Sequence, residues 1–214
     1  MCFKINDMIL YQAQTMINRL AAFTDHSLNK AVSQWQVLPN HQFSRKPSPE
    51  KWSATQCLMH LNSYGNYYLP EIEKAIHKAL RAELQPVAGF HPGWLGNYFT
   101  TLMLPEENGM PAKKMSAPKA HSPETNDNHF EVIATFIDQQ EILLSLLQQA
   151  KQIDLNKVKV PISIAKFIRL KLGDILLFLL AHQYRHLLQI DRALEQAGAG
   201  VQHTEAFRLS MLHN

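Results

Sequence analysis

Apolar residues recur every three or four positions in four long segments of the chain, which is the spacing of one buried helix face. No segment shows a convincing strand pattern, and residues 157–171 are predicted to be a short amphipathic piece. The pattern predicts an all-α four-helix bundle with a long crossover connection between helices 2 and 3. The four helices are expected at about Asn6–Trp35, from Ser53 up to a connection that begins at Gln85, at His129–Gln152 and at Leu172–Ala197.

The second helix has the clearest start signal. Ser53 and Gln56 have the spacing of a capping box, and Trp52 before the cap is placed to pack onto Cys57. Pro70 is expected to kink this helix, because proline lacks a backbone donor and crowds the preceding turn.

Residues 85–128 contain many of the prolines and have no sustained periodicity apart from a short helix expected around 93–103. Connections this long in compact domains are usually functional or mobile. We therefore expect the connection to act as a lid or as one wall of a pocket. Its aromatic residues are Phe90, Trp94, Tyr98 and Phe99. Residues 1–200 are predicted to form a single domain, followed by a C-terminal tail at 201–214.

Length and composition narrow the class of protein. A chain of 214 residues is long enough for one well-buried domain, and its net charge is only +3. The basic residues of 157–171 alternate with apolar ones, so nucleic acid is not expected as a partner. Cys2 and Cys57 are too few for a disulfide framework. With neither a signal peptide nor a membrane span in the sequence, the chain is expected to be cytoplasmic.

The stretch LAHQYRHLLQIDRAL, residues 180–194, places His182 and His186 one turn apart. On a helical wheel of about 100° per residue, both fall on the edge of the apolar stripe of the last helix. Arg185 and Arg192 fall on the opposite side, which is predicted to face solvent.

Two inward imidazoles four residues apart can converge on one metal ion, or they can bond to groups of other helices. His60 falls on the apolar side of the second helix and supplies a third nitrogen. Three nitrogen ligands leave at least one coordination position open, as in catalytic rather than structural metal sites. The other eight histidines are predicted to be structural or surface residues: His26, His41, His77, His91, His121, His129, His203 and His213.

Four further residues are candidates for the surroundings of this site. Gln189 lies beside His182 on the wheel, either as a partner of the ligands or as a rim residue. Tyr64 and Tyr67 follow His60 by one and two turns, where they could line a pocket or pack in the core. Cys57 is either a reactive thiol or a small core residue.

The motifs resemble those of the DinB-like superfamily. The matching stretches are KWSATQCLMHL at 51–61, HQYRHLLQI at 182–190 and KMSAPKAHSP at 114–123, the last of which resembles a stretch of some bacterial members. The resemblance implies a four-helix bundle in which His60, His182 and His186 bind one divalent metal ion, zinc or nickel by preference. The name does not imply the DNA polymerase that shares it.

Known members of that superfamily include thiol-dependent S-transferases, an isomerase and presumed metal-dependent hydrolases, so the resemblance leaves the reaction open. We predict hydrolase-type chemistry on an unknown small-molecule substrate. The alternatives are a metal-dependent thiol S-transferase and a non-catalytic metal-binding stress-response bundle. No H-E-x-x-H or G-x-S-x-G motif is present.

Two further expectations concern assembly and pH. Apolar residues beyond the needs of one core, namely Phe167, Leu170 and Phe178, suggest a homodimer. Metal binding is expected to weaken as the pH falls through about 6.5, where free histidine becomes protonated.

Overall fold

The computed structural model describes residues 10–106, 109–111, 113, 115–123 and 128–204. The predicted start of the first helix at Asn6, and residues 205–214 of the predicted tail, lie outside these residues. The helices are α1 (Ala13–Ser33), η1 (Trp35–Val37), α2 (Asn40–Phe43), α3 (Ala54–Arg81), α4 (Trp94–Met103), η2 (Lys119–His121), α5 (His129–Ala150) and α6 (Leu172–Gln196). The strands are β1 (Tyr11–Gln12), β2 (Gly89–Phe90), β3 (Lys159–Ile162) and β4 (Ala165–Lys171).

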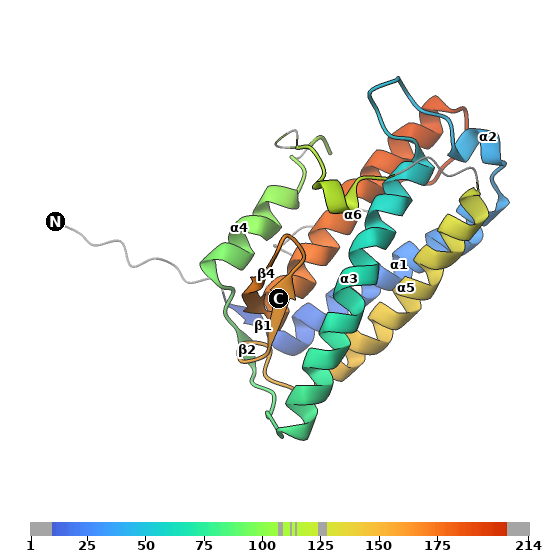
Figure 1. The fold of residues 1–214 in the computed structure, drawn as a ribbon. Coiled ribbons are helices and arrows are strands. Elements are labelled where there is room, and N and C mark those ends of the chain that lie inside the picture. The colour runs from blue at the N-terminus through green and yellow to red at the C-terminus, as the bar shows by residue number, and fades with distance from the viewer. Residues whose placement is uncertain (1–9, 107–108, 112, 114, 124–127, 205–214) are drawn as a thin grey trace.

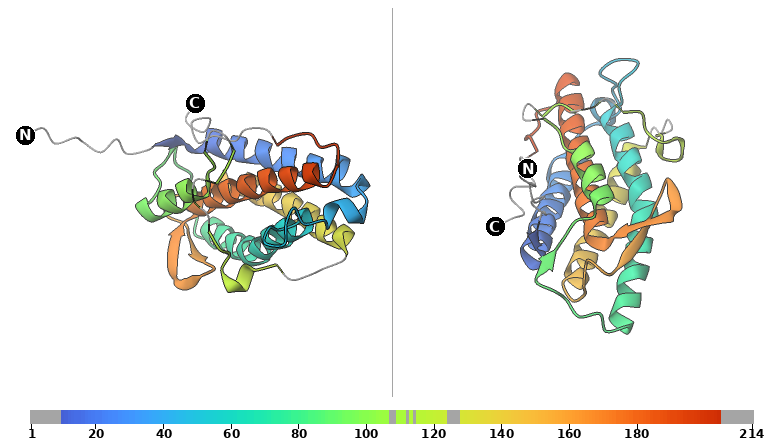
Figure 2. Two further views of the ribbon diagram at one scale, coloured as in Figure 1. Left: turned by 90° about the horizontal axis from the view of Figure 1, so that it is seen from above. Right: turned by 90° about the vertical axis from the view of Figure 1, so that its left-hand side faces the viewer.

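The four long helices α1, α3, α5 and α6 lie side by side, as Figures 1 and 2 show. Helix α3 packs against α5 and α6, and α1 packs against the same two helices. The apolar stripes expected from the sequence face inward, and the mostly helical class is confirmed. The buried stripe residues include Met16, Ile17 and Leu20 of α1, Val132, Phe136 and Leu143 of α5, and Ile175, Leu176 and Leu187 of α6.

Helix α3 begins as the sequence predicts. The Ser53 side chain accepts a hydrogen bond from the Gln56 amide at 3.2 Å, and the Gln56 side chain accepts one from the Ser53 amide at 3.2 Å. This capping box fixes the start of the helix two turns before His60. Pro70 lies inside α3, which continues to Arg81.

The prediction that no strand lies between α5 and α6 was wrong. Strands β3 and β4 form an antiparallel hairpin with a bulge between Pro161 and Ile162. The hairpin has a buried and an exposed side: the paired residues Val160 and Leu170 are buried, whereas Phe167 is 88% exposed. An amphipathic segment this short satisfies helix and strand periodicity almost equally well.

The predicted solvent face of α6 is partly covered, which corrects the sequence interpretation. Helix α4 of the crossover packs along α6. Arg185 donates a hydrogen bond to the Lys113 carbonyl at 2.8 Å, and Arg192 donates one to the Gly109 carbonyl at 3.1 Å. Both arginines are half-buried because the crossover passes over them. A helical wheel shows which face of a helix is charged, but it does not show whether a segment distant in the sequence covers that face.

The evidence for a dimer changes in the same way. Leu170 belongs to β4 and is buried, and Phe178 packs against Tyr64, Tyr68 and Phe99. Of the three residues that suggested the dimer, only Phe167 is exposed, so the dimer stays a prediction. None of the described helices is both long and apolar enough to span a lipid bilayer.

Candidate metal centre

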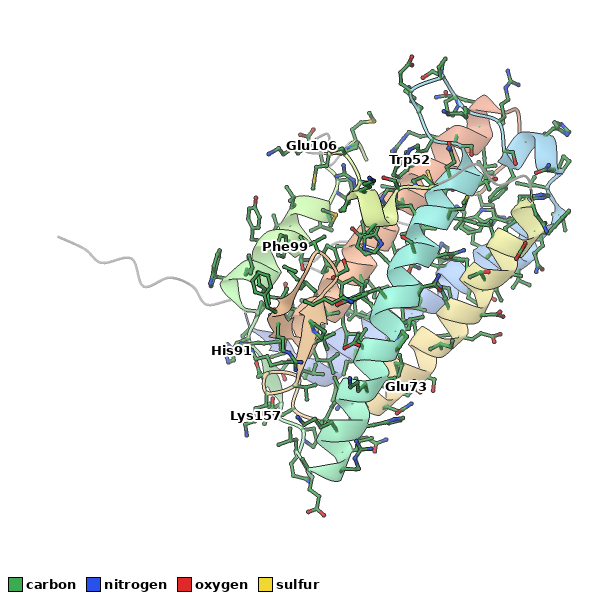
Figure 3. All side chains as sticks on the ribbon, viewed as in Figure 1. Trp52, Glu73, His91, Phe99, Glu106 and Lys157 are labelled. Carbon is green, nitrogen blue, oxygen red and sulfur yellow. The ribbon has the colours of Figure 1, made fainter. Side chains whose placement is uncertain are left out.

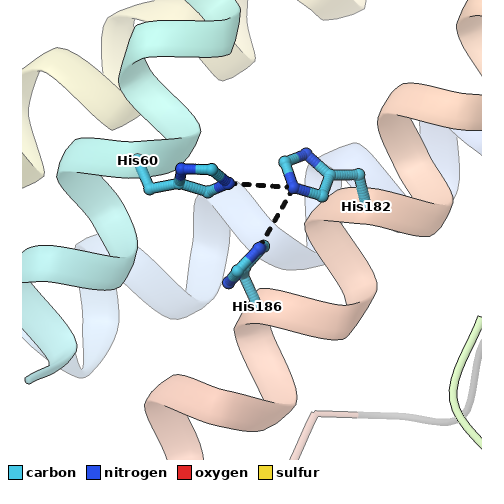
Figure 4. Close-up of side chains that lie close together, drawn as sticks. All are labelled: His60, His182 and His186. Atoms are coloured by element: carbon cyan, nitrogen blue, oxygen red, sulfur yellow. Dashed lines mark hydrogen bonds between the residues drawn. The ribbon is translucent and has the colours of Figure 1, made fainter. Parts of the chain in front are cut away.

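Helices α3 and α6 bring three predicted ligands together between them, as Figure 4 shows. His60 Nε2 lies 3.1 Å from His182 Nε2, which in turn lies 3.1 Å from His186 Nε2. The side chains are almost fully buried, with residue exposures of 3%, 4% and 7% in the same order. In the described part of the chain, these three histidines are the group of His, Cys, Asp or Glu that could hold a metal ion.

The Nδ1 atoms of His60 and His186 each have a hydrogen-bond acceptor. His60 Nδ1 donates to the backbone carbonyl of His121 at 2.6 Å, and His186 Nδ1 donates to the Gln189 side-chain oxygen at 3.1 Å. A neutral imidazole has one N–H, so both rings present an Nε2 lone pair to His182. The sequence left Gln189 open between a partner of these histidines and a rim residue, and its contact with His186 favours the partner.

This arrangement suits a cation. A neutral His182 can donate one Nε2 hydrogen at most, so at least one facing lone pair has no donor within the trio. Metal–nitrogen bonds of about 2.0–2.1 Å at angles near 90–110° place ligand nitrogens roughly 2.8–3.4 Å apart. The observed separations of 3.1 Å fall in that range. The residues present therefore fit a divalent ion with imidazole ligands.

Burial keeps the three rings neutral. Desolvation lowers the pKa of His60 to about 4, against the small opposing effect of its hydrogen bond to His121. Desolvation, followed by the neighbouring histidines, holds the pKa of His182 and of His186 well below the usual value. Neutral imidazole is the form that binds metal, so near pH 7 no proton has to leave a ligand.

Aromatic rings surround the trio on several sides. The Trp52 ring lies 5.1 Å from that of His60 and 6.0 Å from that of His186. The Tyr64 ring lies 4.4 Å from that of His182, and the Phe178 ring stacks on His182 at 5.7 Å. Figure 3 labels Trp52 at the start of α3 and Phe99, which contacts Phe178, on α4. These rings keep water away from much of the centre.

Other predicted neighbours lie elsewhere. Tyr67 donates to the Ile162 carbonyl of the hairpin at 3.3 Å, so it does not line the centre. Cys57 is fully buried, and burial raises the pKa of its thiol, which favours the small core residue over the reactive thiol. Trp94 and Tyr98 are 82% and 54% exposed.

His121 is the site residue that sequence reasoning missed. It was predicted to be structural or on the surface, yet it is 6% exposed and its carbonyl orients His60. Its ring lies 4.0 Å from that of Tyr64, and its Nδ1 bonds Ser63 Oγ at 3.0 Å. The connection between α3 and α5 therefore lies against His60 at η2. No local signal could have shown this, because the contact uses a backbone oxygen.

A small cavity lies on the α5 side of His182. Its volume is about 30 Å³, and Tyr64, Gln139, Gln140 and Gln183 are among its lining residues. A space of this size accommodates about one or two water molecules and no substrate.

Comparison with known proteins gives one family. The family model described as the DinB superfamily matches residues 23–190, which include all three histidines. No curated protein and no solved structure matches the chain significantly.

Proposed function

The chain belongs to the DinB superfamily, and on that premise we propose that it is a metal-dependent enzyme with hydrolase-type chemistry. The site we propose holds one divalent ion, zinc or nickel by preference, on His60, His182 and His186. As part of the proposal, α1, α3, α5 and α6 form the four-helix bundle expected of the family, with the connection after α3 as its long crossover.

One observation carries the proposal. One ring nitrogen of each buried histidine lies within 4.8 Å of the other two, and the Nδ1 partners of His60 and His186 turn their Nε2 lone pairs inward. A set of core histidines that served packing alone would satisfy its acceptors with donors from other helices.

The residues of the chain would have distinct roles in such an enzyme. The three imidazoles bind the ion, while the His121 carbonyl and Gln189 orient two of them. Trp52, Tyr64 and Phe178 limit the access of water. Bound zinc or nickel would supply Lewis-acid activation of water near neutral pH.

Metal content tests the site directly. We expect about one zinc or nickel ion per parent chain after loading, and large losses in His60→Ala, His182→Ala and His186→Ala, because two nitrogens hold an ion weakly. The control is His77→Ala, which changes an exposed histidine on the same helix. Elemental analysis of the four purified variants measures the result. Full loading of all three ligand variants, or none in the parent, would contradict the proposal.

Turnover separates the enzyme from a non-catalytic binding protein. The loaded parent and the His60→Ala variant are compared on a panel of small esters and amides, with and without a chelator. We expect hydrolysis that requires both the metal and His60. Consumption of an added thiol without hydrolysis would instead indicate the S-transferase alternative. Metal uptake without hydrolysis and without thiol consumption would indicate the non-catalytic metal-binding protein.

A further inference from the structure

Arg185, which immediately precedes His186 on α6, has an unused donor in a buried position. Its Nη2 donates to the Lys113 carbonyl of the crossover at 2.8 Å. Its Nη1 is buried and has no hydrogen-bond partner in the part of the chain that the structure describes. A buried guanidinium nitrogen without an acceptor is costly, because it has lost its water and gained nothing in return. The cost would be relieved by a ligand that accepts a hydrogen bond.

Among the described residues, no carboxylate forms an ion pair with Arg185. Arg192 lies two turns further along α6 and holds the same crossover segment through the Gly109 carbonyl. Two guanidinium groups therefore hold this segment, one through the Lys113 carbonyl and one through the Gly109 carbonyl. The ion pairs among the described residues are Lys30–Asp191, Lys157–Asp154 and His203–Glu195. Neither arginine takes part in one of them.

The Arg185 guanidinium lies close enough to the histidine centre to lower the pKa values of His182 and His186. The groups that shift the pKa values of His60, His182 and His186 are other histidines, Arg185 and local hydrogen-bond partners, with no carboxylate among them. Three neutral imidazoles leave the charge of a divalent ion unbalanced. An ion there and the Arg185 guanidinium together favour an anionic ligand.

We propose that the free Nη1 of Arg185 binds a carboxylate of the substrate, so that the centre acts on small carboxylate-bearing molecules. This inference rests on the function proposed above and specifies its substrate class. A carboxylate fits better than a phosphate, because Nη2 is already occupied and the Lys113 carbonyl that it binds would repel further anionic oxygens.

The test uses acetate as the probe and acetamide as its neutral counterpart. Binding of each to the full chain is measured by saturation-transfer NMR, both metal-free and after zinc loading. We expect the parent to bind acetate and not acetamide. Arg185→Gln should weaken acetate binding roughly tenfold or more in both forms, because a charged hydrogen bond is lost.

Two matched controls separate this role from a structural one. Arg192→Gln removes the other arginine that donates a hydrogen bond to the connection over α6. Arg81→Gln removes an exposed arginine about 30 Å from His60 along α3. Both should bind acetate within about twofold of the parent. If Arg192→Gln weakens acetate binding as much as Arg185→Gln does, the proposal is overturned. Such a result would indicate that either substitution loosens the connection over α6, or that acetate responds only to the overall positive charge.

Two other results would also overturn the carboxylate assignment. The first is unchanged acetate binding by Arg185→Gln. The second is displacement of acetate by inorganic phosphate at a concentration well below that of acetate itself. Elemental analysis of the same samples keeps the two proposals apart. If the parent binds metal but its acetate binding does not depend on Arg185, this inference alone is refuted. If the parent binds no metal, the proposed function is refuted, and acetate binding by the metal-free protein then tests whether Arg185 binds a carboxylate.

Discussion

Two hydrogen bonds to Nδ1 atoms determine what the histidines present to one another. The acceptor for His60 is a backbone carbonyl, which cannot be protonated or replaced by substitution, and the acceptor for His186 is the amide oxygen of Gln189. Neither acceptor carries a charge, so each fixes a tautomer and opposes the loss of basicity caused by burial less than a carboxylate would. The centre thus combines oriented lone pairs with neutral rings.

The neutral rings predict a pH dependence of stability for the metal-free protein. The pKa of His60 is lowered to about 4 by burial, and those of His182 and His186 lie well below 6.5. The unfolded chain, with histidine pKa values of about 6.5, binds more protons below that pH than the folded chain does. The free energy of unfolding should therefore have its full value above about pH 6.5 and should decrease as the pH drops toward 4.

Urea unfolding at pH 7 and pH 5 measures this effect, which should be on the order of 1–2 kcal/mol per buried histidine. His186→Gln should reduce the difference between the two pH values, and His77→Ala should leave it unchanged. Equal stability of the parent at both pH values would show that the rings are not held neutral. The same shift moves the expected loss of metal binding to a pH below 6.5.

Sequence periodicity was sufficient to predict the three histidines but not their supports. Each ligand lies on a long apolar stripe, so its inward direction followed from helix geometry. Gln189 was a candidate because it lies about one turn from His186 on the same helix, but periodicity left a rim position equally open. The roles of His121 and Phe178 depend on the path of the crossover and on the packing of α4, and neither has a local signature.

Among the elements, α3 matters most for the position of the site, because it carries His60 two turns from its start. Ser53 is 3% exposed, so its cap is shielded from water. The cap and the buried face of the helix together fix the rotation of His60 toward α6.

Ser53→Ala should therefore destabilise the protein by about 1 kcal/mol, because the Gln56 amide loses its acceptor. For a chain of this size the melting temperature should fall by roughly 2–4 °C. The control is Ser48→Ala, which removes a side-chain contact to Glu50 in the preceding loop and should change little. Thermal unfolding followed by circular dichroism measures both variants, and an unchanged melting temperature for Ser53→Ala would argue against the cap.

The predictability of the elements depended on their length. Helices of 21 to 28 residues repeat the 3.6-residue period often enough to be recognised. The hairpin of β3 and β4 was missed for two reasons: Pro161 lies in its first strand, and its connection, Ser163–Ile164, lacks the Gly or Asn of common two-residue turns.

At the scale of the whole molecule, a buried ion pair joins α1 to α6, and residues after α6 form hydrogen bonds to both of its charged groups. Lys30 Nζ lies 2.7 Å from Asp191 Oδ1, with side-chain exposures of 2% and 3%. Lys30 also donates to the Gln202 carbonyl at 2.5 Å, and the Thr204 amide donates to Asp191 Oδ2 at 2.6 Å. The described part of the predicted tail is thus part of the packed structure, because it supplies the remaining partners of two buried charges.

Asp191→Asn should destabilise the protein by about 3–5 kcal/mol, because it leaves the Lys30 ammonium buried without a counter-charge. The double variant Lys30→Met, Asp191→Leu should recover much of that loss, because it removes both buried charges and fills the space with apolar groups. Urea unfolding of the parent, the single variant and the double variant measures the cycle. If the free energy of unfolding of Asp191→Asn stays within about 1 kcal/mol of that of the parent, water must reach the Lys30 ammonium. Residues 202–204 would then not shield the ion pair from water as the geometry indicates. Metal content should be retained in the double variant, since Asp191 lies more than one turn beyond His186 and touches none of the three ligands.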